Sequence, residues 1–375
     1  IYLLAAVLGV VVCRTFHLPP MLGYLAVGVV IGPNALALAQ NSEGMRHLAE
    51  FGVVFLMFVI GLEFNLPKLR AMRRHVFALG GLQVLLTMGV VTIGSVALSL
   101  VLPKFWTMGW QTALALSGAL TMSSTAIVVK LMAERSEIES EHGKRVMGVL
   151  LFQDLAVVPL LILIPALGTP DESLFNAMAV ALLKGAVLIA VLLVGGQWVM
   201  RYWLNVVARR KSEELFVLNV LLITLGLAWM TEMAGLSLEL GAFIAGMLIS
   251  ETPYKQQVEV DIRAFHDVLL GLFFISIGMM LDWRLVLQRW ELVLLLLTVP
   301  LLFKAALVTM ISRGLGAAMG VSMRTGLYLA QAGEFGFVLL ALAQKNHLIS
   351  PELINPILAS MVLSMMATPL IIQHA

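Results

Sequence analysis

The sequence predicts an all-α membrane protein of about thirteen transmembrane helices, arranged as two inverted-topology repeats. Three observations support this fold class: the composition is too apolar for water, the apolar segments are long enough to cross a bilayer, and the chain resembles itself. Hydrophobic residues make up 60% of the chain and charged residues 12%, whereas a soluble domain is about half apolar and a quarter charged. We therefore expect lipid to be the solvent for most of the surface.

The apolar segments give the predicted spans, because a helix needs about 20 apolar residues to cross the hydrocarbon core. We place them at 1–15, 20–38, 48–64, 76–102, 110–132, 146–167, 174–204, 215–233, 236–250, 268–281, 292–312, 325–343 and 353–372. Tight loops are expected around Leu18 and Gly235. The chain starts inside an apolar run without a Met, so we expect both ends to be trimmed.

The distribution of basic residues predicts the orientation in the membrane. With the N-terminus outside, the cytoplasmic loops would hold sixteen of the 24 Lys and Arg residues. Three more lie inside predicted spans, and the outer loops would hold only Arg46, Lys104, Arg284, Arg289 and Lys345. The positive-inside rule then predicts an N-terminus outside and a C-terminus inside. We expect the membrane to be a bacterial inner (plasma) membrane.

Charge and cysteine content exclude several function classes. The net charge is +2, and no basic run interleaves with aromatic residues, so no nucleic-acid partner is expected. Cys13 is the single cysteine, which excludes disulfides and Cys-based metal sites. The seven His residues show no metal-ligand spacing, and no P-loop, GxGxxG or Ser-His-Asp pattern occurs. We therefore expect no enzyme and no energy source other than an ion gradient.

The internal repeat has a spacing of about 218 residues. LGYLAVGVVIGP at 22–33 parallels LGAFIAGMLISE at 240–251, and the following helices end in IGLEFN (60–65) and IGMMLD (277–282). The paired elements are seven positions apart in the order of the predicted spans, the second and the ninth, so they would run in opposite directions. Such repeats are typical of secondary transporters with a site near the bilayer midplane. We predict repeat one at 1–168, a linker helix at 174–204 and repeat two at 215–373.

Asp154 is the clearest candidate for an ion-binding residue. It lies in LLFQDLAVVPLL (150–161), near the middle of the sixth predicted span. An ionisable group at such a depth is costly in lipid and indicates function. The adjacent Gln153 could offer its carbonyl oxygen to the same ion, or could make an ordinary hydrogen bond between helices.

Lys304 is the second ionisable residue in the middle of a predicted span. Pro300, four residues earlier, should kink that helix and free a backbone carbonyl. A buried lysine needs a carboxylate partner or loses its proton. We expect Asp154 to be that partner in a core ion pair, and the alternative is that Lys304 extends to an interface.

Two predicted spans carry residues that interrupt a helix. LTMSSTAIV (120–128) places the hydroxyls of Ser123, Ser124 and Thr125 at mid-depth. Ends of broken helices aim dipoles and free carbonyls at the midplane, where they can bind ions. We therefore count the three hydroxyls as candidate cation and proton ligands. The alternative is that they bond to the preceding turn of their own helix.

The second interruption is QAGEFGFV (331–338), where Gly333 and Gly336 flank Glu334. Glu334 could act directly, gate the site or make a purely structural pairing. Glu63 lies near the end of the third span and is expected at the interface. No catalytic residue is predicted, and the only metal expected is a monovalent cation on Asp154.

Several strings along the chain resemble one family. These are GYLAVGVVIGP, FVIGLEF, SSTAI, LLFQDLAVVPL, LGAFIAGMLISE, LGLFFISIGM and QAGEFGFVL. They are similar to the membrane domain of Kef-type potassium/proton antiporters, in the cation:proton antiporter-2 family. The resemblance implies a sodium/proton antiporter-like fold with two crossing broken helices, and a homodimer. It places the family's ion-binding Asp at Asp154, its Gln neighbour at Gln153 and its core Lys at Lys304.

The same resemblance implies a cytosolic regulatory domain after the membrane domain. Kef proteins continue into a nucleotide-binding domain that senses glutathione, so nucleotide and glutathione would act only through a domain outside this chain. An ancillary subunit is a further possible partner. The segment YKQQVEVDI (254–262) occupies the place of the family's acidic regulatory loop. It keeps Glu259 and Asp261 as possible gating residues but loses the His-Ala-Leu start, which puts glutathione gating in doubt.

The resulting hypothesis is exchange of one cation for one proton on the Asp154 carboxylate. Potassium or sodium is the substrate, no cofactor is expected in this chain, and the remaining partners are lipid and a second copy. The alternatives are a sodium/proton antiporter, a gated potassium channel and a sodium-coupled organic-anion symporter. Lys304 argues against the symporter, which has no need of a midplane lysine beside an aspartate.

Overall fold

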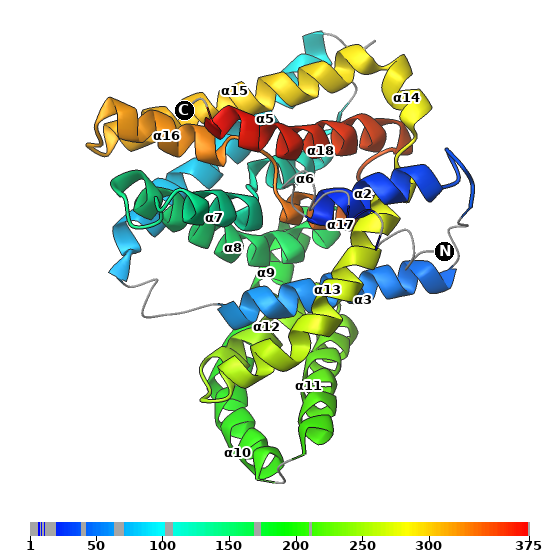
Figure 1. Cartoon of the computed structure of the whole chain (residues 1–375), viewed down its shortest axis with the longest axis vertical. Coiled ribbons are helices and arrows are strands. Elements are labelled where there is room, and N and C mark those ends of the chain that lie inside the picture. The colour runs from blue at the N-terminus through cyan, green and yellow to red at the C-terminus, as the bar shows by residue number, and fades with distance from the viewer. Residues whose placement is uncertain are drawn as a thin grey trace. The chain divides into compact units, whose positions relative to one another are not determined.

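The computed structural model describes residues 20–38, 43–63, 71–101, 108–168, 174–209 and 212–373, with positions 7, 9 and 11 beside them. Every regular element in this part of the chain is a helix (Figure 1). Apart from those three positions, the predicted span at 1–15 and the loop at Leu18 lie outside the described residues.

Each of the other predicted spans coincides with one or more helices. In chain order the elements are α2 (Pro20–Ile31), α3 (Glu43–Glu63), η1 (Arg74–Gly80), α5 (Gly81–Val101), α6 (Trp110–Thr121), α7 (Thr125–Glu134), α8 (Glu141–Leu167), α9 (Leu174–Val191), η2 (Leu192–Gly196), α10 (Gln197–Ala208), α11 (Glu213–Met233), α12 (Leu238–Ser250), α13 (Lys255–Met280), α14 (Trp283–Gln288), α15 (Trp290–Gly314), α16 (Met319–Leu329), α17 (Glu334–Lys345) and α18 (Pro351–Gln373). The expected tight turn at Gly235 is present, with φ of +80°.

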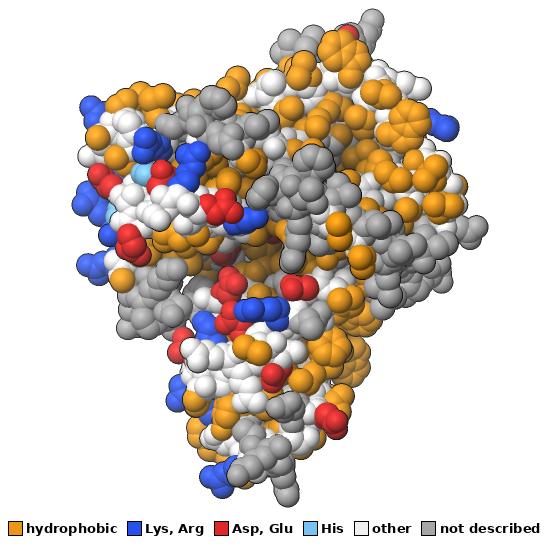
Figure 2. Space-filling view, viewed as in Figure 1, with side chains coloured by type: hydrophobic (Ala, Val, Ile, Leu, Met, Phe, Trp, Pro, Cys, Tyr) orange, Lys and Arg blue, Asp and Glu red, His pale blue; other side chains and the backbone are white. Residues whose placement is uncertain are grey.

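The helices are those of a multi-pass membrane protein. Among the described residues, five spans are long and apolar enough to cross a bilayer, and two bent helix pairs pass the same test. Large apolar side chains are exposed on the described helices, including Leu100 (79%) on α5 and Trp198 (77%) on α10. Figure 2 shows such side chains over much of one face. The total of thirteen spans stays a prediction.

One expected loop is wrong. The segment 254–262 is helical from Lys255, because α13 begins there rather than at Val268. Val258 and Ile262 are buried at a spacing of four residues, the period of one helix face. The charged residues at the start of α13 lower the hydropathy of this segment. A search for apolar spans therefore misses it, although it is an amphipathic helix.

The described chain divides into two compact units. The first comprises Ile1–Leu66 with Leu161–Met280, and the second comprises Pro67–Leu160 with Leu281–Ala375. The units are interleaved in sequence, since each takes one segment from either half of the chain.

In the first unit, α2 packs on α13 and α12 packs on α3. A Cβ atom built on Gly28 would lie 2.2 Å from the carbonyl oxygen of Ile275. A Cβ atom on Gly246 would lie 2.0 Å from the carbonyl oxygen of Phe58. The sequence repeat pairs Gly28 with Gly246 and residue 58 with residue 275. The two contacts therefore correspond to each other in the two repeats.

The reciprocal contacts show the same correspondence. A Cβ on Gly278 would lie 2.2 Å from the carbonyl oxygen of Leu25, and one on Gly61 would lie 2.1 Å from that of Phe243. Only glycine allows backbones to approach this closely. The sequence repeat is therefore also a repeat of helix packing within this unit.

In the second unit, both expected helix breaks are present. Helix α6 ends at Thr121 and α7 begins at Thr125, with extended backbone between them. Helix α16 ends at Leu329 and α17 begins at Glu334, and these two halves are bent by 45°. A Cβ on Gly333 would lie 2.4 Å from the backbone of Ser123, so the two breaks meet in direct contact.

Candidate functional site

The Lys304 side chain lies at the meeting point of the two breaks. It comes from α15, is 2% exposed and donates three hydrogen bonds. Its Nζ atom lies 3.2 Å from the carbonyl oxygen of Leu120, 2.8 Å from that of Met122 and 2.9 Å from that of Gln331. An ammonium group has three protons, so all of them are used.

These contacts correct the expected partner of Lys304. The ammonium is bound by backbone carbonyls rather than by the Asp154 carboxylate, and it does not extend to an interface. The carbonyls belong to the C-terminal ends of α6 and α16, which carry partial negative charge. Lys304 therefore compensates two helix ends at once. The sequence could not reveal this, because every residue type has a carbonyl.

Glu334 lies at the N-terminal ends of the two helices that follow the breaks, α7 and α17. It is the first residue of α17 and is 7% exposed. Its Oε1 atom accepts a hydrogen bond from the backbone N–H of Ala126 (3.4 Å), in the first turn of α7. Two N-termini, which carry partial positive charge, thus share one carboxylate. This is the structural pairing considered for Glu334, and a direct or gating role stays a prediction.

One of the three candidate hydroxyls, that of Ser123, connects the two breaks. The Ser123 hydroxyl donates to the carbonyl oxygen of Leu329 (2.8 Å), at the end of α16, instead of bonding to its own preceding turn. Ser124 is the N-cap of α7, where its oxygen accepts from Ile127 N–H (3.3 Å). The Thr125 hydroxyl oxygen is buried and has no hydrogen-bond partner among the described residues.

Gln153 makes the hydrogen bonds between helices that were one of its two expected roles. Its Oε1 accepts from the backbone N–H of Ser123 (2.8 Å). Its Nε2 lies 2.8 Å from Gln83 Oε1 and 3.2 Å from the carbonyl oxygen of Thr121. Gln83 was missed from the sequence, although a glutamine in the run GLQVLLTMGVV is a visible signal. Ion binding by Gln153 stays a prediction.

Asp154 follows Gln153 on α8 and is partly buried. Because Gln153 is bonded directly to the α6–α7 break, Asp154 is one residue away from that connection. Among the described residues, no three His, Cys, Asp or Glu side chains form a group that could hold a metal ion.

The remaining candidates lie in the first unit. Glu63 is exposed as the last residue of α3, as expected for an interfacial position. Glu259 lies 3.9 Å from Arg263 within α13, and Asp261 is partly buried on the same helix. Their suggested gating roles stay predictions.

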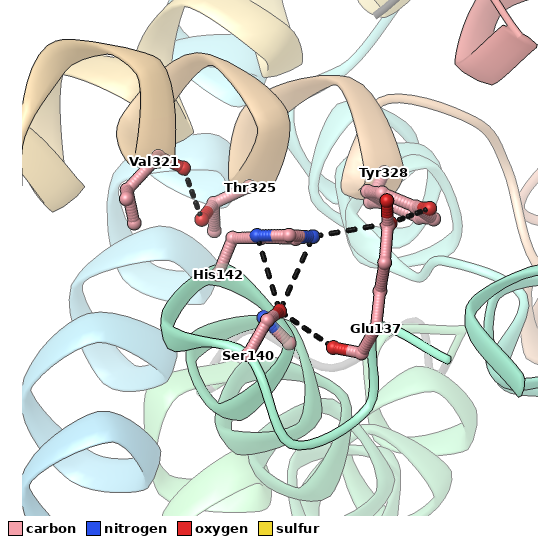
Figure 3. A network of polar contacts seen from close by, with 7 residues as sticks. Glu137, Ser140, His142, Val321, Thr325 and Tyr328 are labelled. Carbon is pink, nitrogen blue, oxygen red and sulfur yellow. Dashed lines mark hydrogen bonds and ion pairs between the residues drawn. The ribbon is translucent and has the colours of Figure 1, made fainter. Parts of the chain in front are cut away.

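A second polar cluster, missed from the sequence, connects the α7–α8 turn to α16 (Figure 3). Tyr328 donates its hydroxyl proton to Glu137 Oε2 (2.6 Å), and His142 Nε2 lies 3.2 Å from the same oxygen. The Ser140 hydroxyl donates to the Glu137 carbonyl oxygen. Burial opposes ionisation of Glu137, but the hydrogen bonds from Tyr328 and His142 outweigh it and lower the pKa of Glu137.

Comparisons with known proteins agree with the predicted fold. The family described as sodium/hydrogen exchanger, transmembrane, matches residues 2–374. A solved structure, that of the sodium proton antiporter MjNhaP1 from Methanocaldococcus jannaschii at pH 8, has a TM-score of 0.69. It covers 99% of this chain and 96% of its own, at 14% identity, and so shows the shared fold.

Sequence relatives are proteins named as potassium efflux antiporters. "K(+) efflux antiporter 2, chloroplastic" of Arabidopsis thaliana is 39% identical over 357 residues, covering 93% of this chain and 30% of that protein. "Putative K(+) efflux antiporter KefB" of Alkalimonas amylolytica is 39% identical over 362 residues, covering 96% and 53%. This chain thus spans about a third to a half of these relatives.

These matches confirm the resemblance to Kef-type antiporters and the antiporter-like fold. They also agree with the expectation that the protein is a transporter and not an enzyme. The chain belongs to the sodium/hydrogen exchanger family.

Proposed function

We propose that the chain is the membrane domain of a monovalent cation:proton antiporter that exchanges potassium for protons on Asp154. The observation that carries the proposal is the position of Asp154 directly after Gln153, which is hydrogen-bonded into the α6–α7 break. Broken helices are where secondary transporters bind their ions. The names of the relatives, potassium efflux antiporters, support the choice of substrate.

The exchange follows from the chemistry of a single carboxylate. Asp154 can hold a proton or a cation, but not both. An empty, charged carboxylate resists movement through the lipid core, because an uncompensated charge is costly there. A loaded carboxylate is neutral and can alternate between the two faces. One cation is then exchanged for one proton. Because Lys304 is already bonded to three carbonyls, it stays in place during this cycle.

Potassium is favoured over sodium by the ligands beside Asp154. Gln153 and the hydroxyls of Ser123, Ser124 and Thr125 would supply neutral oxygens. Sodium holds its hydration shell more tightly, so stripping it takes a stronger field, such as a second carboxylate. Sodium/proton exchange is the alternative.

The cellular setting is part of the same proposal. The protein acts as a homodimer in the inner membrane of a bacterium, with its N-terminus outside and its C-terminus inside. A cytosolic domain outside this chain regulates it. The length of the relatives beyond the matched region leaves room for such a domain.

Proton flux in proteoliposomes tests this function. Addition of potassium, sodium or lithium should move protons through the wild-type protein, with potassium at least as effective as sodium. Asp154→Asn keeps the shape but removes the charge, so it should abolish the flux while the melting temperature is retained. Glu232→Gln, which changes an exposed carboxylate on α11, is the matched control and should transport normally. Normal flux through folded Asp154→Asn would refute exchange on Asp154.

A further inference from the structure

The side-chain amide of Gln331 is buried and has no hydrogen-bond partner among the residues that the structure describes. Gln331 lies between α16 and α17 and is 1% exposed, and both its Oε1 and its Nε2 lack a partner within that part of the chain. Its backbone is engaged, because its carbonyl oxygen accepts from Lys304 and the next N–H, that of Ala332, donates to Ser364 Oγ (3.1 Å). Buried side-chain amides are nearly always hydrogen-bonded, so one without a hydrogen bond needs an explanation.

The other buried glutamines of this unit behave differently. Gln153 is also 1% exposed, yet its oxygen and nitrogen are both bonded to neighbouring helices. Gln83 donates to Thr87 Oγ1 (3.2 Å) and accepts from Gln153. These two amides hold the helices together. The Gln331 side chain makes no such hydrogen bond to any described residue, so the packing of these helices does not account for its amide.

The first broken helix shows what the fold requires at this position. Met122 and Gln331 correspond, because both carbonyl oxygens accept from Lys304. The residues after them correspond too, since the N–H of each donates to a side chain, Gln153 and Ser364 respectively. Met122 is fully buried and apolar. A side chain of that length without polar atoms is therefore compatible with such a break.

Two further polar atoms at these breaks are also idle. Thr125 and Glu334 are the first residues of α7 and α17. Neither Thr125 Oγ1 nor Glu334 Oε2 has a hydrogen-bond partner among the described residues. The oxygens without partners at the two breaks therefore include an amide carbonyl, a hydroxyl and a carboxylate oxygen. Such oxygens replace the hydration shell of potassium and sodium. The carboxylate also offsets repulsion between a cation and Lys304.

We propose that the side-chain amide of Gln331 is a ligand of the transported monovalent cation and helps to set the affinity for it. The proposal rests on the proposed exchange function. The amide costs free energy while it is idle, and that cost is recovered when its oxygen coordinates the cation. Gln331 thus contributes to cation binding without holding helices together, whereas the amides of Gln153 and Gln83 also form hydrogen bonds between the helices of the site.

Gln331→Met tests this role, because methionine is the residue found at the corresponding position of the first break. Cation-driven proton flux should show a KM for potassium raised by about tenfold, with kcat changed by less than about threefold, as for loss of one binding contact. The melting temperature without cation should not fall, and its rise on adding potassium should be reduced. Gln83→Met is the matched control and should lower the melting temperature, since it removes bonds to Gln153 and Thr87.

The outcomes separate this proposal from the proposed function. A lower melting temperature of Gln331→Met with an unchanged KM would make the amide structural and overturn the proposal, as would no change in any measurement. If the wild-type protein shows no exchange at all, the proposed function fails. The potassium-induced rise in melting temperature of wild type and Gln331→Met then still decides whether the amide binds the cation.

Discussion

The two units solve the problem of close helix crossing in different ways. In the first unit α2 meets α13, and α3 meets α12, through glycines such as Gly28 and Gly246. In the second unit the breaks α6–α7 and α16–α17 meet through Gly333. Both crossings bring backbone into direct contact, and both depend on the absence of a Cβ atom. They differ in the state of the backbone hydrogen bonds.

At the crossings of the first unit, the helices are continuous and keep their own hydrogen bonds. Glycine is then sufficient, and the neighbouring side chains, such as Phe58 and Ile275, are apolar. At the breaks of the second unit, carbonyl and N–H groups lose their helical partners. Because lipid offers no replacement, the protein must supply one. Lys304, Glu334, Ser123 and Gln153 do so, which is why buried polar groups gather in that unit.

The largest expected effect comes from removing the Lys304 ammonium group, which is hydrogen-bonded to backbone carbonyls at both helix breaks. Lys304→Met leaves the carbonyls of Leu120, Met122 and Gln331 without a donor. Leaving a buried polar group unpaired costs about 1–3 kcal/mol, so we expect a loss of at least about 3 kcal/mol in the free energy of unfolding. Thermal unfolding in detergent measures it.

The control for Lys304→Met is Lys130→Met on α7. The Lys130 side chain is 47% exposed and lies 3.9 Å from Glu134, so its removal should change stability by no more than about 1 kcal/mol. If Lys304→Met melted at the same temperature as Lys130→Met, the stability of the two helix breaks would not depend on Lys304.

A smaller effect is expected at the glycine crossings of the first unit. Gly246→Ala places a Cβ atom 2.0 Å from the carbonyl oxygen of Phe58. Overpacking of this kind costs about 1–3 kcal/mol. The repeat predicts that Gly28→Ala, at the corresponding contact, lowers the melting temperature by a similar amount.

Gly226→Ala on α11 is the matched control, since a Cβ atom there would meet nothing within 4 Å. It should stabilise the helix by about 0.5–1 kcal/mol, because alanine is the better helix former. Equal melting temperatures for Gly246→Ala and Gly226→Ala would contradict the packing described for α3 and α12.

The sequence predicted much of this architecture because lipid imposes strong constraints. Apolar length located the helices, and hydroxyls or glycines located both breaks. The amphipathic start of α13 was missed because Glu259 and Asp261 lower the hydropathy there. Length criteria alone also leave the number of spans open, since α2 and α12 have only 12 and 13 residues.

The site was predictable only in part. Lys304 and Glu334 stood out because a charge within an apolar span is rare, but their partners could not be inferred. The partners of Lys304 are backbone carbonyls, which leave no trace in the sequence. Gln331 was read only as part of a motif, since nothing in the sequence distinguishes an idle amide from a bonded one such as Gln153. That distinction requires coordinates.

The smallest expected effect concerns the cluster of Glu137, His142 and Tyr328, where a polar contact lies outside the breaks (Figure 3). Tyr328→Phe removes the hydrogen bond to the Glu137 carboxylate. The expected loss at pH 7 is about 1 kcal/mol in the free energy of unfolding, less than at Lys304, since Glu137 is 23% exposed and water can replace the donor.

The effect of Tyr328→Phe should depend on pH with a defined sign. The pKa of Glu137 is lower in the folded state than its ordinary value of 4.5. Its contribution to stability is therefore complete above pH 4.5 and is lost as the pH falls through the folded pKa. We expect the gap in melting temperature between wild type and Tyr328→Phe to be constant from pH 7 to pH 5 and to narrow below pH 4.5. A gap that is the same at pH 7 and below pH 4 would show that the ionised carboxylate is not what Tyr328 stabilises.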